Sequence, residues 1–245
     1  MLSNYRIIVE FDGTGFSGWQ NQSGRNNTIQ GQLENALKIV LKHEVKLIGA
    51  GRTDAGVHAL NQTANFFSSI NFDSIRLLNS VNSLIPRSIT VKNISGVSDS
   101  FHARYSAKAR EYEYRITLKR ISVGRMYYHH VKYPLNFKLM TVAAEIFKGE
   151  HSFKSICKNK SDKHDFKCNV SKFEIKLNRT GQMLVFRIKA NRFLHSMVRG
   201  LTGTIIDIGR GKLDLDDVKN KFRNGEKIKA TYLPPDGLFL KKIYY

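Results

Sequence analysis

The chain has 245 residues, 41% of them hydrophobic, which allows one large domain or two small ones around a buried core. Forty Lys and Arg against twenty Asp and Glu give a formal charge of +20. We therefore expect a polyanion such as nucleic acid as partner, and no membrane, because the sequence has no long apolar run, lipidation signal or signal peptide.

The first half of the chain alternates strand and helix patterns. Thr28 is a predicted N-cap, and apolar residues follow it at helical spacing. Pro86 ends a second helical pattern. The predicted strands span residues 5–11, 45–48, 61–67 and 89–97, and the predicted helices span residues 29–43 and 72–84.

The second half repeats this order with one additional helix. A turn signal at residues 178–181 separates two alternating runs and predicts a hairpin. The predicted strands span residues 109–118, 170–177, 183–190 and 238–244, and the predicted helices span residues 139–149, 193–208 and 214–224. The two βαββαβ patterns share no sequence similarity. They predict an α+β fold whose ferredoxin-like halves, residues 1–103 and 104–245, join into one mainly antiparallel sheet flanked by helices.

A glycine-rich stretch at residues 49–59 separates two apolar runs and carries a single acid, Asp54. Its glycines allow a positive φ and the close approach of a ligand. A phosphate-binding P-loop is excluded because Val57 and His58 stand where that motif needs lysine and a hydroxyl residue. A dinucleotide fingerprint is excluded because Asp54 replaces its third glycine.

Asp54 leaves two interpretations open. A lone carboxylate argues against paired-carboxylate hydrolysis, but it can act as a nucleophile when an arginine such as Arg52 keeps it ionised. Its side chain can equally cap a turn or a helix start, which is a common role for Asp.

Several motifs in register resemble the tRNA pseudouridine synthase A family across essentially the whole chain. They are residues 11–20 (FDGTGFSGWQ), 28–34 (TIQGQLE), 51–59 (GRTDAGVHA), 101–112 (FHARYSAKAREY), 191–199 (NRFLHSMVR) and 235–240 (PDGLFL). The resemblance implies the pseudouridine synthase fold. It also implies isomerisation of uridine to pseudouridine at positions 38, 39 and 40 of the tRNA anticodon stem-loop, with no metal or organic cofactor.

The same resemblance assigns roles to individual residues. Asp54 becomes the nucleophile, attacking the ribose C1′ or the uracil C6, and a glycal route with Asp54 as base stays open. Tyr112 matches the substrate-contacting tyrosine, while Tyr114 on the same face is expected to be an ordinary strand aromatic. Arg199 is assigned to pair with Asp54. Leu238 is assigned to the wall of the uracil pocket, with core packing as an equal alternative.

A target within a stem must be extruded before it reacts. His58 and Arg52 are candidates to fill the gap or to hold the displaced phosphate. The resemblance also implies a homodimer, because one tRNA is large relative to one cleft. The cysteine count, too low for a disulfide framework, favours the reducing cytoplasm as the location.

Basic residues cluster in two places, before Tyr112 and in the loop at residues 152–169. They are Arg104, Lys108 and Arg110 in the first cluster and Lys154, Lys158, Lys160, Lys163 and Lys167 in the second. Such residues would bind phosphates with little sequence selectivity. In the same loop, Cys157, His164 and Cys168, with His151, match no known zinc spacing.

The chain departs from the family pattern at residues 161–170 and 231–234. The first departure affects expected RNA contacts, and the second affects the expected pocket rim. Two rival functions are a binding module without activity and a small-molecule nucleotide enzyme; weak, salt-independent tRNA binding would favour the latter.

Overall fold

The computed structural model describes residues 2–21, 27–158 and 165–245, which form two compact units. The first unit runs to Lys108 and takes up Phe239–Tyr245 again at the end of the chain; the second is Ala109–Leu238. The expected boundary lies between residues 103 and 104. The observed boundary follows Lys108, and residues 239–245 belong to the first unit instead of the second. The Lys108 amide donates to the Tyr244 carbonyl at 2.8 Å, which holds the residues before β5 and the last strand in one unit.

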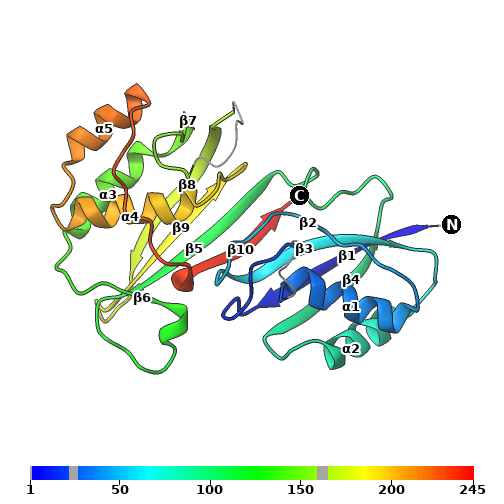
Figure 1. Cartoon of the computed structure of the whole chain (residues 1–245). Coiled ribbons are helices and arrows are strands. Elements are labelled where there is room, and N and C mark those ends of the chain that lie inside the picture. The colour runs from blue at the N-terminus through cyan, green and yellow to red at the C-terminus, as the bar shows by residue number, and fades with distance from the viewer. Residues whose placement is uncertain (1, 22–26, 159–164) are drawn as a thin grey trace. The chain divides into compact units, whose positions relative to one another are not determined.

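The first unit contains β1 (Ser3–Phe11), α1 (Ile29–Leu41), β2 (Ile48–Gly49), β3 (His58–Ser68), α2 (Ser74–Leu84) and β4 (Ile89–Val97) (Figure 1). Strand β1 lies antiparallel between β4 and β3. On the other side of β3, β2 pairs near Ala64 and the last strand, β10 (Leu238–Tyr244), pairs in parallel near His58. The buried side chains of β1 and α1, including Ile7, Val9 and Leu33, form the core of this unit.

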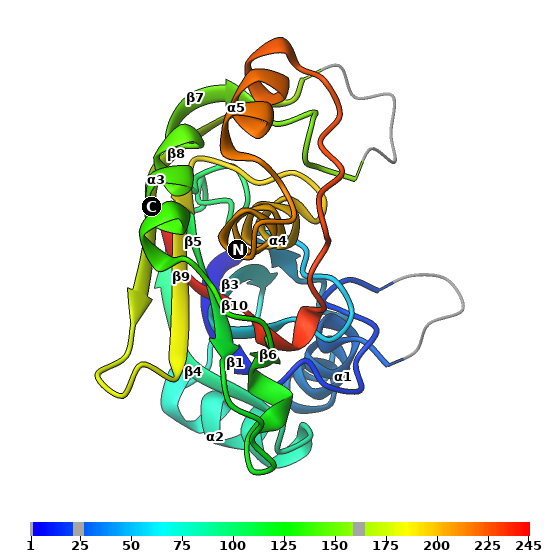
Figure 2. The ribbon, with the colours of Figure 1, turned by 90° about the vertical axis from the view of Figure 1, so that its left-hand side faces the viewer.

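The second unit contains β5 (Ala109–Thr117), β6 (His129–His130), α3 (Phe137–Ile146), β7 (Gly149–Ser152), β8 (Lys167–Leu177), β9 (Met183–Ala190), α4 (Met197–Gly209) and α5 (Leu215–Asn224). Short 3₁₀ helices lie at Arg125–Tyr127 (η1) and Pro235–Gly237 (η2). The strand order β5-β9-β8-β7 is antiparallel throughout, and β6 adds in parallel to β5. Helix α4 packs against α3 and beside β5 (Figure 2).

The α+β class and the mainly antiparallel strand pairing are confirmed. Thr28 caps α1 as predicted, because its hydroxyl accepts the Gly31 amide at 3.2 Å. Helix α4 begins four residues later than its apolar period indicates, since Ser196 adopts a left-handed conformation with φ 55°. The short strands β6 and β7 were not predicted, because two to four residues carry too little periodicity to recognise.

Candidate active site

Asp54 lies in the loop that joins β2 to β3, residues 50–57, called here the Asp54 loop. The Val57 amide donates to the Asp54 main-chain carbonyl at 3.2 Å, and Gly56 has a φ of 77°. The Asp54 main-chain carbonyl thus helps to close a tight turn at this point of the loop. The carboxylate is half-buried.

A second loop, between β1 and α1, braces the Asp54 loop through close backbone approaches. The Trp19 amide donates to the Thr53 carbonyl at 3.2 Å. Gly18 has a φ of 97°, and a Cβ atom there would lie 2.6 Å from the Thr53 oxygen. A Cβ on Gly49 would overlap the buried indole of Trp19. Gly49 therefore serves packing rather than ligand access, while at Gly51 a Cβ would meet open space.

His58 is buried, with 1% of its surface exposed. Its Nδ1 lies 3.0 Å from Asp12 Oδ1 and 3.1 Å from the Gly13 amide nitrogen, and one ring nitrogen can serve only one of them. Nδ1 accepts the Gly13 amide when it carries no proton and donates to Asp12 when it does, so either contact helps to hold the ring in place. The ring also stacks on Phe239 of β10 at 4.7 Å. The expectation that His58 fills a gap or holds a phosphate is thus replaced by a structural role beneath the loop.

Arg52 is exposed on the same loop as Asp54. Within residues 2–21, 27–158 and 165–245, no carboxylate forms an ion pair with its guanidinium. An exposed arginine on a braced loop can bind a phosphate in bidentate geometry.

Tyr112 and Tyr114 of β5 point to the same face of the second unit's sheet but differ in environment. Tyr112 is half-buried, and its ring meets Phe193 edge-on at 5.0 Å. Tyr114 is fully buried and donates its hydroxyl to the Pro234 carbonyl at 2.7 Å. Burial, and then the charge of Asp236, raise the pKa of Tyr114 far above its usual range. Tyr114 is therefore the core aromatic that the sequence predicted.

Arg199 lies in the first turn of α4, where residues 231–234, called here the strap, run along the helix. Its Nε donates to the Leu233 carbonyl at 2.5 Å, and its own carbonyl accepts the Leu233 amide at 3.4 Å. The Nε bond orients the Arg199 side chain toward the strap, and the main-chain bond holds Leu233 against the first turn of α4. Pro234, held by Tyr114, continues into η2 and then into Leu238, which is 6% exposed.

Two further hydrogen bonds hold the strap in place, at Thr231 and Tyr232. The Thr231 hydroxyl donates to Asp207 Oδ2 at 2.6 Å, and the Tyr232 hydroxyl donates to the Ile156 carbonyl at 2.6 Å. A Cβ on Gly203 would overlap the Thr231 carbonyl, so the helix surface has a groove at this point. The hydroxyl groups of Thr231 and Tyr232 thus supply contacts that hold the strap.

Sequence similarity to known proteins shows which family this chain belongs to. The sequence model of the tRNA pseudouridine synthase family matches residues 7–106 and 143–245. The chain belongs to this family. A tRNA pseudouridine synthase A of Thermoanaerobacter pseudethanolicus is 39% identical over the full length of both chains. One of Chlorobium phaeobacteroides is 38% identical over all of this chain and 94% of its own. A solved H/ACA ribonucleoprotein bound to substrate RNA is far more distant, with 13% identity over 83% of this chain and 44% of that chain and a TM-score of 0.37.

Membership of the tRNA pseudouridine synthase family makes the chain an enzyme of the isomerase class and confirms the resemblance found in the sequence. Asp54, Arg52 and His58 lie in the first unit, and Tyr112, Arg199 and Leu238 lie in the second. In the part of the chain that the structure describes, no helix has the length and apolar character to cross a membrane.

The cysteine-containing loop carries no metal cluster among the described residues. His164 lies outside them, as do Lys160 and Lys163. Cys157 and Cys168 are buried, and burial raises the pKa of the Cys168 thiol to about 11. Lys154 and Lys158 lie over the rings of Phe166 and Tyr232 at 5.8 and 5.0 Å.

Sequence reasoning missed the residues that hold the site in place. Asp207 is the clearest case, because it is the only acid between Glu174 and Asp214 and stands in an apolar helical run, as Asp54 stands alone among glycines. That isolation was a usable signal. The pairing of Asp12 with His58 had no such signal, because 46 residues separate them and neither belongs to a local pattern.

Proposed function

We propose that this family member converts uridine to pseudouridine at positions 38, 39 and 40 of the tRNA anticodon stem-loop, with Asp54 as the nucleophile. The observation that supports the proposal is a lone carboxylate on a loop that is braced by close backbone contacts from the loop between β1 and α1. A carboxylate held in this way needs little reorganisation before it attacks.

The reaction breaks the bond between N1 of uracil and C1′ of ribose and forms a bond from C5 to C1′. The C5 proton leaves and N1 gains a proton, so atoms balance without a co-reactant. Asp54 attacks C1′ or C6 in the nucleophilic routes and removes a proton in the glycal route. All three need Asp54 ionised, and Arg199 is the cation that we assign to pair with it.

Tyr112 is assigned to contact the extruded uracil, and Leu238 to the apolar wall beside it. The contrast with Tyr114 supports this choice, because the Tyr114 hydroxyl is engaged by Pro234 and its ring is fully buried, whereas the Tyr112 ring is half-exposed. A tyrosine ring can stack on a base, and its hydroxyl can relay a proton. Arg52 is assigned to a phosphate beside the extruded nucleotide.

We further propose that the enzyme acts as a homodimer in the cytoplasm. A sedimentation measurement that gives a monomer at working concentration would disprove the dimer. For the activity itself, the decisive experiment is incubation with unmodified tRNA followed by site-resolved pseudouridine mapping. Pseudouridine at positions 38–40 supports the proposal. Pseudouridine at other positions would show that the enzyme has a different target. The absence of any product would favour a binding module without activity.

A further inference from the structure

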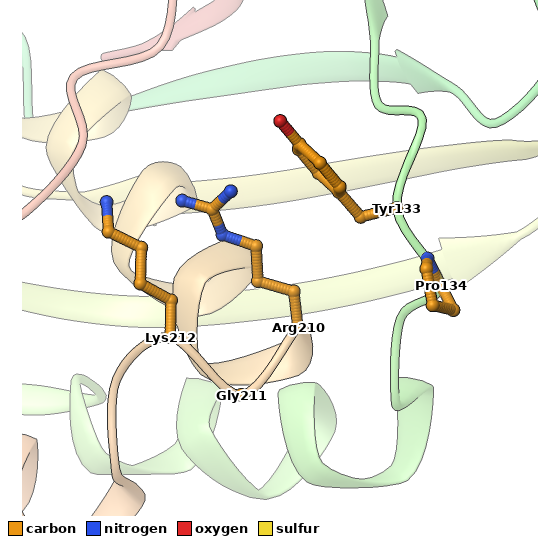
Figure 3. A pocket seen from close by; sticks show the side chains of 5 residues that line it. All are labelled: Tyr133, Pro134, Arg210, Gly211 and Lys212. Carbon is orange, nitrogen blue, oxygen red and sulfur yellow. The ribbon is translucent and has the colours of Figure 1, made fainter.

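A hollow in the second unit lies where α4 ends, beside the segment that joins β6 to α3. Its lining residues are Tyr133, Pro134, Arg210, Gly211 and Lys212, and its volume is about 360 Å³ (Figure 3). We call it the Arg210 hollow. This volume suits a small group such as a phosphodiester with part of its ribose. Arg199 lies eleven residues before Arg210, about 16 Å along the helix, so the hollow is separate from the site built around Arg199.

The two cations of the hollow are set side by side by one buried carboxylate. Arg210 Nη2 lies 2.7 Å from Asp207 Oδ1, and Lys212 Nζ lies 3.2 Å from Asp207 Oδ2. Asp207 also accepts the Thr231 hydroxyl, and only 2% of its side chain is exposed. Because Asp207 does not line the hollow, an incoming anion meets the cations and not the carboxylate. The cluster has two positive charges for one negative charge.

Tyr133 completes the arrangement from the opposite wall. The Arg210 guanidinium lies 5.0 Å from the centre of the Tyr133 ring, and the Asn136 amide donates to the Gly209 carbonyl at 2.7 Å, which ties the two walls together. In Figure 3 the Tyr133 hydroxyl and the nitrogen ends of Arg210 and Lys212 lie toward the same side. Arg210 Nε is buried, so it is the terminal guanidinium nitrogens of Arg210 that can meet an anion.

We propose that the Arg210 hollow binds one phosphodiester group of RNA, outside the catalytic site. Arg210 and Lys212 supply the charge, and the Tyr133 hydroxyl supplies a third donor. The assignment of that RNA as tRNA rests on the proposed function. Arginine is suited to the role because its planar fork matches the phosphate oxygens, and such contacts fix the position of the RNA without reading its sequence.

The simpler alternative is that these cations only offset the negative end of the α4 dipole and add to the net charge. Lys221 provides a matched control, since its Nζ forms an ion pair with Asp217 at 2.7 Å on α5 but faces neither an aromatic ring nor the Arg210 hollow. Lys221→Gln removes the same charge as Arg210→Gln. A specific phosphate contact must therefore distinguish the two variants.

The test measures the affinity of the full chain for an unmodified tRNA transcript from 50 to 300 mM salt. We expect Arg210→Gln and Lys212→Gln each to reduce the salt slope of log Kd by about 1 and to weaken binding about fivefold near 150 mM salt. Lys221→Gln should keep the wild-type slope. Each single variant leaves Asp207 with one cation and Thr231, so the fold is retained. Equal slopes for Arg210→Gln and Lys221→Gln would overturn the proposal.

Tyr133→Phe provides a second measurement, because it keeps the ring and removes only the hydroxyl. Binding should weaken about fivefold with an unchanged salt slope; unchanged binding would remove Tyr133 from the subsite and contradict the proposal. A further arm titrates inorganic phosphate at constant ionic strength. If phosphate binds the wild type and not Arg210→Gln, while tRNA affinity is the same for both, the ligand is a free anion and the RNA assignment fails.

These binding measurements do not depend on turnover. A wild-type chain that forms no pseudouridine at positions 38–40 but shows the expected slopes would disprove the proposed target and support the subsite. An active wild-type chain whose variants all keep the same salt slope would support the proposed target and disprove the subsite.

Discussion

The Asp54 loop and the strap along α4 hold their functional side chains by opposite means. The Asp54 loop is braced by backbone approaching backbone, with Gly13 against Val57 and Gly18 against Thr53 at the points of contact. The strap is held by side-chain hydroxyls and by Arg199, which bond to main-chain carbonyls and to Asp207. Backbone bracing tolerates no added atom, whereas each side-chain bond is one of several modest contributions. Substitutions should therefore be severe in the first region and graded in the second.

The largest expected effect comes from Asp54 itself. Asp54→Asn keeps the size of the side chain and removes its charge and nucleophilicity, so we expect turnover to fall at least about a thousandfold. Thermal unfolding and tRNA affinity should stay close to wild type, because the turn is closed by the Asp54 backbone. Pseudouridine formation in single-turnover reactions is the measurement. An unfolded variant would instead give Asp54 a capping role.

The next effect tests the backbone bracing. Gly18→Ala places a methyl group 2.6 Å from the Thr53 oxygen at a φ of 97°, and we expect a loss of about 3 kcal/mol in the free energy of unfolding. Gly15→Ala is the matched control, because Gly15 also has a positive φ, 80°, but no atom within 4 Å of the added carbon. Its loss should be about 1 kcal/mol. Equal losses in urea titrations would show that the close approach contributes nothing.

A smaller effect is expected when the strap loses one bond. Tyr114→Phe and Tyr232→Phe each leave one main-chain carbonyl without its hydroxyl donor. We expect each variant to lose about 1.5 kcal/mol in the free energy of unfolding. We also expect kcat to fall about fivefold, because Arg199 loses its fixed position. Tyr245→Phe removes an equivalent bond, to the Ala103 carbonyl, away from the strap. It should lower stability and leave kcat at the wild-type value. A fall in kcat for all three variants would contradict a positioning role.

The smallest effect comes from the ionisation of Tyr114 and is measurable only above pH 10. The folded state raises the pKa of Tyr114, so the unfolded chain loses this proton first as the pH rises above 10. The contribution of Tyr114 is therefore complete below pH 10 and decreases above it, by about 1.4 kcal/mol per pH unit. We expect the stability difference between wild type and Tyr114→Phe to shrink between pH 10 and 11 in urea titrations. A constant difference would mean that the phenol ionises equally in both states.

Local patterns were sufficient for most elements and for some individual residues. Thr28 as a cap and Tyr114 as a core aromatic follow from spacing and alternation, and both are confirmed. The role of Gly49 could not be predicted, because its small size is required by Trp19, thirty residues away in the sequence. The burial of His58 likewise depends on Asp12 and on Phe239, which no periodicity connects.

The pairing of the last strand with β3 has a consequence for synthesis of the chain. Phe239–Tyr245 complete the first unit, but 130 residues of the second unit, Ala109–Leu238, are translated before them. At ribosomal rates this interval is roughly 7–26 s, during which β3 lacks its partner near His58 and exposes an unpaired edge. A nascent chain that stops before residue 239 would therefore hold Asp54 in an unfinished unit. The pairing that completes the first unit therefore waits until the whole second unit has been synthesised.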